Sequence, residues 1–124
     1  MKTAVFDIDE TILVAKKWGD AVGANGEIPG ALEFVKNLES EGYTIAYCTA
    51  RPSDFTQEVM AALADYGFPH TPELVFLLPK DGDNVPRYKK NTIKMLMDKG
   101  YDVERFYDDV KVNRSVVSNL GVPI

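Results

Sequence analysis

The stretch V-F-D-I-D-E-T-I, residues 5–12, places two carboxylates where an apolar strand should continue. Residues 2–8 have the composition of a strand buried on both faces, and such strands normally read as continuous apolar runs. Side chains alternate along an extended segment, so we expect Asp7 and Asp9 on the same side, at the strand's carboxyl end. Two neighbouring anions repel unless a cation or a shared proton relieves them. The stretch therefore predicts a functional site directly after the first strand.

Downstream of this stretch the chain alternates between strand-like and helix-like segments. This alternation predicts an α/β fold, a parallel sheet with helices on both faces joined by right-handed crossovers. Ligands of such sheets bind at the carboxyl ends of the strands. The expected strands are residues 2–8, 43–49, 73–79 and 103–108, with a stub at 122–124 that could form a fifth; the expected helices are 29–41, 53–67, 87–99 and 112–120.

The connection between the first strand and the first helix, residues 9–28, is long and rich in glycine. Loops of this length without obvious structure are usually lids or mobile flaps, and this one leaves directly from the aspartate pair. We therefore expect residues 10–28 to form a flap beside the site. Trp18, at the middle of this segment, is interpreted as an anchor that packs the flap onto the body of the domain.

Composition places the chain among ordinary globular proteins and sets limits on its partners. At 124 residues, with 45% hydrophobic and 27% charged residues, we expect one domain, residues 1–124. The net charge of −5 argues against a broad sheath of phosphate contacts on nucleic acid, although a local basic patch could hold a strand end. Cys48, the only cysteine, favours a reducing, cytoplasmic setting and is interpreted as a small buried hydrophobe. No segment has membrane-spanning length, so no membrane association is expected.

Polar side chains end several of the predicted strands, so they should meet at one edge of the sheet. The first strand ends in Asp7 and Asp9, the second in Thr49, and the fourth in Asp108 and Asp109. Crowded carboxylates would destabilise the fold unless a cation were bound. Because the donors are all hard oxygens, Mg²⁺ fits better than Zn²⁺, and Mg²⁺ commonly shares its coordination with substrate phosphate. The edge therefore predicts a magnesium site for a phosphorylated substrate.

A cationic side chain is still needed to neutralise the phosphate, and the start of the third expected helix supplies lysines. Ile93, Leu96 and Met97 define the inward stripe of that helix. At about 100° per residue, Lys89 falls near the centre of the stripe and Lys90 toward its flank. We therefore expect Lys89 to enter the site and Lys90 to remain solvated.

Together these residues carry a resemblance to a known superfamily. The segments F-D-I-D-E-T at 6–11, Y-C-T-A-R at 47–51, Lys89, and F-Y-D-D at 106–109 resemble the four ordered motifs of the haloacid dehalogenase (HAD) superfamily of phosphohydrolases. The resemblance implies a three-layer Rossmann-like (HAD-like) parallel sheet in strand order 3-2-1-4-5. It also implies Mg²⁺ as cofactor and a phosphoaspartyl enzyme intermediate.

The resemblance further implies roles for individual residues in the reaction. Asp7 would be the nucleophile and a metal ligand. Asp9 would be the general acid and base, and its backbone carbonyl would contact Mg²⁺. Thr49 and the Ala50 N–H would hold phosphate oxygens, while Lys89 would neutralise charge in the transition state.

The remaining motif positions concern the metal and the substrate. Asp109 resembles the acid that binds the metal directly, and Asp108 would act through a water or through Lys89. Arg51 could contact a phosphate or form a surface salt bridge. The chain has no room for the cap domains of larger HAD members, so we expect a capless, open site. An open site admits bulky phosphoesters, such as a nucleic acid end, unless oligomerisation closes it.

Several functions agree with this pattern, and the sequence favours one. It predicts a Mg²⁺-dependent phosphomonoester hydrolase. The D-G-D segment at 81–83, followed by Pro86 and Lys89, is similar to the corresponding loop of polynucleotide 3′-phosphatase domains, which narrows the substrate to nucleic acid 3′-phosphates. The alternatives are a nucleotide or sugar phosphatase and a non-enzymatic phosphoacceptor signalling domain. The signalling domain fits less well because the third expected strand ends in Leu77-Leu78-Pro79, without an acceptor aspartate.

Overall fold

The computed structural model of the chain describes residues 1–17 and 20–122. Within these ranges, four parallel strands form one sheet in the order β3-β2-β1-β4, which confirms the predicted α/β fold with a parallel sheet. No helix in the described ranges is long and apolar enough to cross a bilayer. The strands are β1 (Lys2–Phe6), β2 (Thr44–Pro52), β3 (Val75–Leu78) and β4 (Asp102–Tyr107), and the helices are α1 (Ala31–Ser40), α2 (Thr56–Tyr66), α3 (Val85–Asp98) and α4 (Lys111–Ser118).

The expected fifth strand is absent from the described part of the chain, so the predicted order 3-2-1-4-5 is wrong and the observed order stops at β4. Gly121, with a φ of 87°, turns the chain after α4. Val122 then packs, 4% exposed, among the buried side chains of α3 and α4 instead of pairing with a strand. Residues 123 and 124, and Trp18 with its predicted anchoring role, lie outside the described residues.

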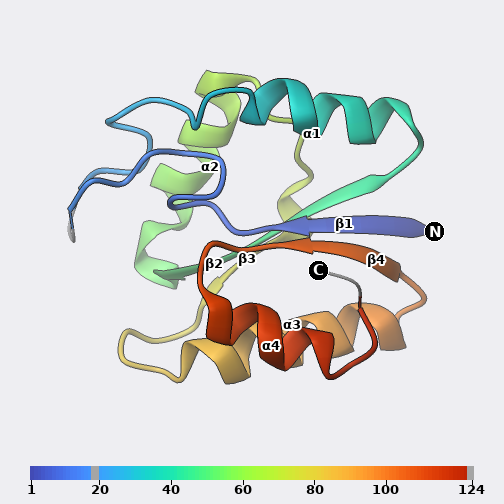
Figure 1. The fold of residues 1–124 in the computed structure, drawn as a ribbon. Coiled ribbons are helices and arrows are strands. Elements are labelled where there is room, and N and C mark those ends of the chain that lie inside the picture. Colours follow the sequence, from blue (N-terminus) through green and yellow to red (C-terminus); the bar gives the residue numbers. More distant parts are fainter. Residues whose placement is uncertain (18–19, 123–124) are drawn as a thin grey trace.

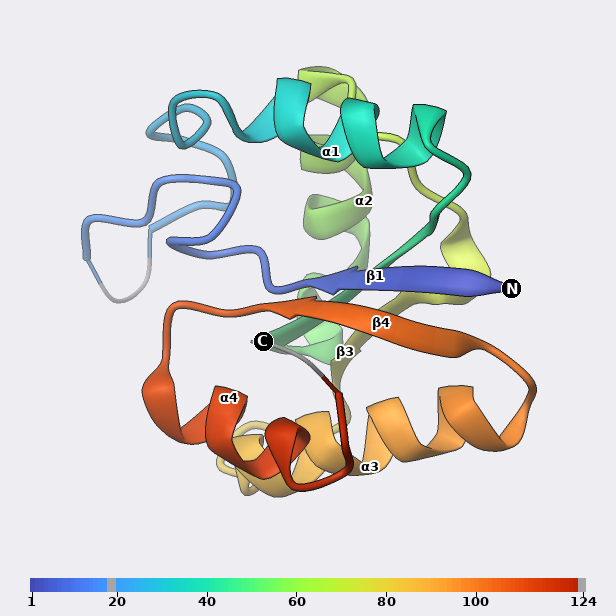
Figure 2. The same cartoon turned by 45° about the vertical axis from the view of Figure 1, so that its right-hand side comes forward.

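The four helices lie on the two faces of the sheet, α1 and α2 on one and α3 and α4 on the other (Figures 1 and 2). Each face has its own buried cluster. Phe6 and Tyr47 belong to the cluster under α1 and α2, whereas Val5 and Cys48 belong to the cluster under α3 and α4. Because successive strand residues point to opposite faces, β1 and β2 contribute to both clusters, as their nearly continuous apolar composition requires.

Helix α3 is specified by its cap and by one buried stripe. The Asn84 side chain caps its first turn by accepting a hydrogen bond from the Arg87 N–H at 3.0 Å. The buried positions are Lys89, Thr92, Ile93 and Leu96, which follow the helical repeat. Met97, which we expected in this stripe, is 40% exposed because the stripe passes one residue before it.

Strand β2 continues further than the sequence indicated. The turn expected at residues 50–52 is instead the end of β2, which bulges between Thr49 and Pro52 in its pairing with β3. A 3₁₀ turn, Ser53–Phe55, follows, and α2 begins only at Thr56. Ser53 does not cap a helix; its hydroxyl donates to the Pro79 carbonyl at 3.0 Å. The amino end of α2 therefore lies further along the chain than the expected start at residue 53.

Backbone hydrogen bonds join the two ends of the segment that links β1 to α1. Leu13 forms an antiparallel bridge with Glu27, and Ile12 accepts from the Ile28 N–H at 2.8 Å. The Tyr66 hydroxyl of α2 donates to the Gly23 carbonyl and ties the segment to the body of the domain. We call residues 10–28 the flap, and it leaves the sheet beside the carboxyl ends of the strands (Figure 1).

Candidate active site

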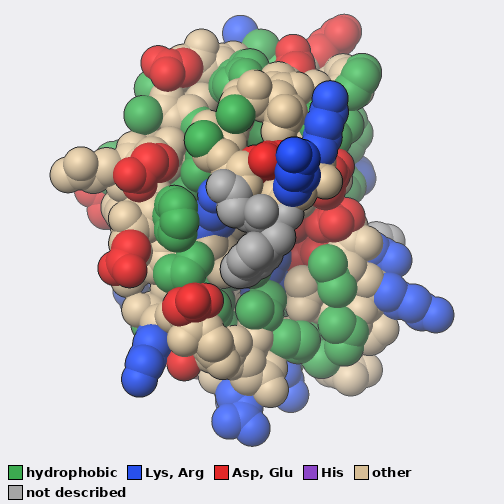
Figure 3. All heavy atoms as spheres, turned by 90° about the vertical axis from the view of Figure 1, so that its left-hand side faces the viewer, with side chains coloured by type: hydrophobic (Ala, Val, Ile, Leu, Met, Phe, Trp, Pro, Cys, Tyr) green, Lys and Arg blue, Asp and Glu red, His purple; other side chains and the backbone are tan. Residues whose placement is uncertain are grey.

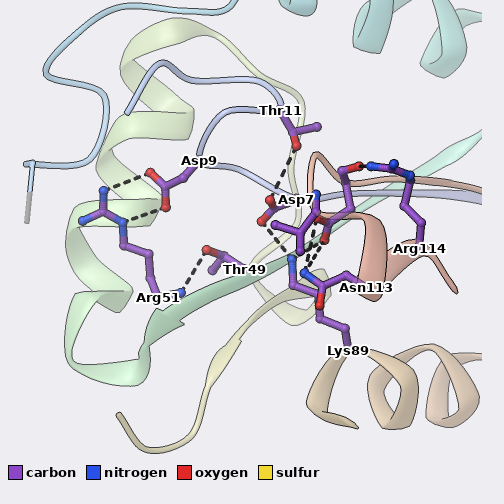
Figure 4. Close-up of polar contacts among 10 residues, drawn as sticks. Asp7, Asp9, Thr11, Thr49, Arg51, Lys89, Asn113 and Arg114 are labelled. Carbon is purple, nitrogen blue, oxygen red and sulfur yellow. Dashed lines mark hydrogen bonds and ion pairs between the residues drawn. The ribbon is translucent and has the colours of Figure 1, made fainter. Parts of the chain in front are cut away.

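Charged and polar side chains from three strands and one helix meet at the carboxyl edge of the sheet (Figure 4). Asp7 directly follows β1, Thr49 lies near the end of β2, and Asp108 follows β4. Lys89 reaches the same place from the first turns of α3. The parallel topology explains the convergence, because every strand delivers its last residues to this edge.

The centre of the site is an ion-pair triad formed by Lys89 and two aspartates. The Lys89 Nζ lies 3.0 Å from Asp7 Oδ1 and 2.5 Å from Asp108 Oδ2. Lys89 is fully buried, whereas Lys90 is exposed on the other side of α3. The structure thus places Lys89, as expected from the helical repeat, beside Asp7 and Asp108.

The triad pairs one ammonium with two carboxyl groups, and this shifts the pKa values of its members. Burial raises the pKa of the Asp7 carboxyl to about 8; the Lys89 charge opposes this shift and the Asp108 charge adds to it. Burial alone would lower the pKa of Lys89, but the facing charges of Asp7 and Asp108 outweigh it and raise that pKa. One ammonium thus serves two buried carboxylates, and a further cation would be stabilised beside them.

Asp109 adds a third carboxylate and completes a cation-binding geometry. Ligand oxygens of Asp7, Asp108 and Asp109 all lie within 4.8 Å of one another. Asp7 and Asp108 are buried, and Asp109 is exposed toward a cavity. An all-oxygen set with one open side suits a hard divalent ion such as Mg²⁺, which retains waters and accepts phosphate oxygens. The described residues therefore fit the predicted metal.

Asp108 is held by residues that sequence reasoning missed. The Asn113 amide donates to both Asp108 carboxylate oxygens at 3.3 Å, and the Val110 N–H donates to Oδ1 at 2.9 Å. The Arg114 guanidinium donates to the Asp108 main-chain carbonyl at 2.7 Å. Because Lys89 and Asn113 already bind its carboxylate oxygens, Asp108 positions Lys89 more than it offers a free oxygen to a metal. Helical spacing could have found Asn113, because it shares the inward face of α4 with Val117.

The structure does not bring the Asp9 carboxylate to Asp7. Arg51 holds it instead, through Nε to Oδ2 at 2.8 Å and Nη2 to Oδ1 at 2.9 Å (Figure 4). The expectation that both aspartates share a side assumed an extended chain, but β1 ends at Phe6. Beyond it, the Ile8 carbonyl accepts three consecutive N–H groups and closes a tight turn, so strand alternation does not reach Asp9.

The predicted phosphate-binding residues occupy the end of β2. Thr49 is fully buried, and its hydroxyl accepts a hydrogen bond from the Arg51 N–H at 3.1 Å. Ala50 is exposed and, with Arg51, lines the cavity. The structure thus places Ala50 and Arg51 where a ligand could reach them, and Thr49 directly behind them.

A cavity of about 660 Å³ opens at this edge of the sheet. Asp7, Lys89 and Asp109 line one part of it. Figure 3 shows that hydrophobic side chains are interspersed with acidic and basic ones on this face of the molecule. The cavity therefore has a charged part and an apolar wall. The wall is formed by Pro52, Phe55, Val85, Pro86, Val110 and Val112.

The fold is similar to that of two solved structures, one of which is a phosphatase. A class C acid phosphatase from Bacillus anthracis, with tungstate bound, has a TM-score of 0.70 at 20% identity, over 97% of this chain and 61% of its own. The structure of the Pnkp1/Rnl/Hen1 RNA repair complex includes a chain with a TM-score of 0.77 at 19% identity, over 98% of this chain and 40% of its own. This chain therefore spans less than two thirds of either neighbour.

The family follows from the sequence itself. The chain belongs to the family described as PITM 1-3, LNS2 domain, whose profile matches residues 4–123. No curated protein sequence matches the chain. The HAD-like resemblance is thus supported by both the family and the fold of the structural neighbours.

Proposed function

We propose that this domain is a Mg²⁺-dependent phosphomonoester hydrolase that works through an aspartyl-phosphate at Asp7. The observation that carries the proposal is the buried triad, in which Lys89 bridges Asp7 and Asp108 beside the open carboxylate of Asp109. A structural ion pair would need neither a second buried carboxylate nor an adjoining cavity. The arrangement has the parts that phosphoryl transfer requires: a nucleophile, a fixed cation and a place for a metal.

In the first half of the proposed reaction, Asp7 attacks phosphorus and the P–O bond to the leaving group breaks. Lys89 occupies Asp7 Oδ1, which leaves Oδ2 as the attacking oxygen. Asp9 donates a proton to the departing oxygen. Asp7 and Asp109, with the Asp9 backbone carbonyl, would hold Mg²⁺, which supplies charge neutralisation at the phosphoryl oxygens.

In the second half, a water attacks the phosphorus of the aspartyl-phosphate. Asp9 takes the proton of that water, phosphate leaves, and the Asp7 carboxylate is regenerated. Lys89, fixed by Asp108, stabilises the charge on the phosphoryl oxygens in both halves. Thr49, the Ala50 N–H and Arg51 at the end of β2 bind the phosphate.

The narrower proposal concerns the substrate. The capless domain leaves the cavity open, so it admits bulky phosphoesters, and nucleic acid 3′-phosphates are the first choice. The fold likeness to a chain of an RNA repair complex supports this choice. Nucleotide or sugar phosphates are the alternative. The lone buried Cys48 supports a cytoplasmic enzyme.

The proposal is tested by hydrolysis of p-nitrophenyl phosphate with Mg²⁺ and with EDTA. We expect metal-dependent turnover in the wild type and a loss of at least about 10³-fold in Asp7→Asn, because the nucleophile is removed. Asp65→Asn, on the exposed surface of α2, is the charge-matched control and should keep wild-type activity. Retained turnover in Asp7→Asn would show that Asp7 is not the nucleophile.

A substrate panel decides the narrower proposal. It contains 3′- and 5′-phosphorylated oligonucleotides, nucleoside monophosphates and sugar phosphates, each with Mg²⁺. Preference for the 3′-phosphorylated oligonucleotide supports the first choice, and equal rates across the panel would remove it. A stable phosphoprotein that forms from a small phosphodonor without turnover would instead indicate a phosphoacceptor domain.

A further inference from the structure

Arg51 and Asp9 form a closed pair at the wall of the cavity. The two hydrogen bonds are bidentate, with Nε and Nη2 each facing a separate carboxylate oxygen. Both residues line the cavity, and their side chains are 12% and 28% exposed. The pair is therefore partly screened from solvent yet reachable by a ligand.

The position of Arg51 links this pair to the phosphate-binding segment. Its backbone N–H donates to the Thr49 hydroxyl, so Arg51 and Thr49 are held together at the end of β2. Its guanidinium carbon lies 5.4 Å from the centre of the Phe55 ring, which limits the directions the side chain can take. The guanidinium is thus held with its donors turned to Asp9.

Asp9 and a phosphoryl group would compete for the same donors. A guanidinium binds carboxylate and phosphate with the same two-pronged geometry, and the phosphate carries the larger charge. Lys89 would attract an incoming phosphate to the same cavity. The Asp9 carboxylate, meanwhile, is not a member of the acidic group formed by Asp7, Asp108 and Asp109.

We propose that Arg51 is a phosphate-responsive positioning residue, which holds Asp9 away from Asp7 until a phosphoryl group takes over its guanidinium. The inference rests on the proposed function, since it concerns the acid and base of that reaction. No covalent bond is made or broken in this exchange of hydrogen-bond partners. The exchange frees the Asp9 carboxylate only when a phosphate is bound. Asp9 can therefore act as acid and base only in the occupied site.

The exchange is tested by a double-mutant cycle on the binding of inorganic phosphate, measured by calorimetry at pH 7 with Mg²⁺. We expect Asp9→Asn to bind phosphate about fivefold more tightly, the effect of removing a partly exposed competitor. Arg51→Gln should bind about tenfold more weakly, since a charge-assisted pair is lost. In the double variant the gain from Asp9→Asn should shrink to the part that loss of a negative charge alone produces, because no guanidinium remains to be released.

A matched control separates this exchange from simple repulsion. Glu10 lines the same cavity, but its carboxylate accepts from the Ala15 N–H and is not bonded to Arg51. Glu10→Gln removes the same charge as Asp9→Asn, so any gain it gives is Coulombic and should persist when Arg51 is also replaced. A gain from Asp9→Asn that is undiminished in the Arg51→Gln background would overturn the proposal.

A spectroscopic readout follows Arg51 directly. The chain has four arginines, so the Arg51 Nε–H signal can be assigned by its loss in Arg51→Gln. Added phosphate should shift this signal in the wild type, and Asp9→Asn without phosphate should also shift it from its paired position. A signal that phosphate leaves unmoved, while calorimetry shows binding, would overturn the exchange.

The outcomes distinguish this inference from the proposed function. Turnover with no coupling in the cycle would refute the exchange and leave the hydrolase proposal standing. Coupling without turnover of any substrate would support the exchange and refute hydrolysis. Absence of phosphate binding in all variants would refute both.

Discussion

The Lys89 ammonium carries one positive charge and is buried beside two carboxyl groups. Its neighbours therefore depend on it unequally, since Asn113 and the Val110 N–H also satisfy Asp108 while Asp7 has only a long 3.5 Å bond from the Thr11 hydroxyl. Removal of the ammonium would leave two buried carboxyl groups without a counter-charge, and breaking a buried ion pair in this way is strongly destabilising.

Replacement of Lys89 by Met should accordingly destabilise the domain by about 3–5 kcal/mol and abolish turnover. The volume is nearly conserved, so loss of charge is the main change. Urea denaturation, read by circular dichroism, measures the difference. Lys90→Met, an exposed neighbour on α3, is the control and should change the free energy of unfolding by less than about 0.5 kcal/mol. If Lys89→Met were as stable as the wild type, the charge of Lys89 would make no net contribution to the free energy of unfolding.

The raised pKa of Asp7 makes the metal-free protein sensitive to pH. The pKa rises from 3.8 to about 8 on folding, so between these values the folded state keeps a proton that the unfolded state has released. The stability contribution is full below about pH 4 and is lost as the pH rises toward 8, by up to about 1.4 kcal/mol per pH unit. Thermal unfolding from pH 4 to 8 in EDTA should show this fall.

Two comparisons attribute the fall to Asp7. Asp7→Asn mimics the neutral carboxyl, so its stability should vary less over the same range. Saturating Mg²⁺ should flatten or reverse the trend in the wild type, because the metal competes with the proton for the ligand oxygens. A wild type and an Asp7→Asn variant with the same pH dependence would contradict the assignment.

At this scale, the sequence allowed prediction of residues whose position follows from a regular repeat. The 3.6-residue period of α3 was enough to select Lys89, and strand ends were enough to bring Asp7 and Asp109 together. The Arg51–Asp9 pair was not predictable. It depends on the turn after β1 and on the bulge at the end of β2, and neither follows a periodic pattern.

Among the elements, the flap packs closely against α2 at Gly23. Gly23 has a φ of 77°, and a Cβ placed on it would lie 2.9 Å from the Tyr66 ring, whose hydroxyl binds the Gly23 carbonyl. A side chain at this position would therefore meet both backbone strain and an aromatic ring that cannot easily move away.

Gly23→Ala should destabilise the protein by about 2–4 kcal/mol, of which about 1 kcal/mol is backbone strain and the remainder displacement of Tyr66. Gly26→Ala is the matched control: its φ is 91°, but no atom lies within 4 Å of the added Cβ, so only the strain applies. Thermal unfolding of both variants gives the difference. If both variants lost the same stability, the Tyr66 ring would move aside without cost and would not hold the flap in place.

Element types were easier to predict than element ends. Every helix and the first four strands lie where apolar periodicity placed them, because burial of one stripe or face determines that periodicity. The ends differ where a side chain or a bulge decides them. Pro52 was assigned to a turn, yet it closes β2 against Leu78. Leu74 was assigned to a strand, yet it belongs to a 3₁₀ turn that begins at Pro72.

In the whole molecule, the parallel sheet joins the two buried clusters through its central strands. β2 lies between β1 and β3, and Cys48 is fully buried on its α3 side. Burial also raises the pKa of its thiol from 9.0 to about 12, so the reactive thiolate is scarce in the folded state. Reagents reach this thiol only if β2 separates from the helices, and Cys48 therefore reports on opening of the whole domain.

Modification of Cys48 by a disulfide reagent at pH 8 should be limited by global unfolding. Its rate should rise with urea in parallel with the unfolded fraction and fall when Mg²⁺ and phosphate stabilise the folded state. Above about pH 9 the unfolded thiol ionises while the folded one stays protonated, so stability falls and labelling accelerates beyond the intrinsic rise in thiol reactivity.

A surface thiol provides the reference rate for this measurement. Ser118→Cys in a Cys48→Ala background places a thiol at an exposed position of α4, and it should react without any dependence on urea. If native Cys48 reacted as fast as this reference, β2 would have to open locally without the rest of the sheet. Since β2 shares its buried side chains between both clusters, local opening would break both at once. If the domain unfolds as a single cooperative unit, labelling of Cys48 must therefore be slow, must accelerate with urea and must be retarded by ligands.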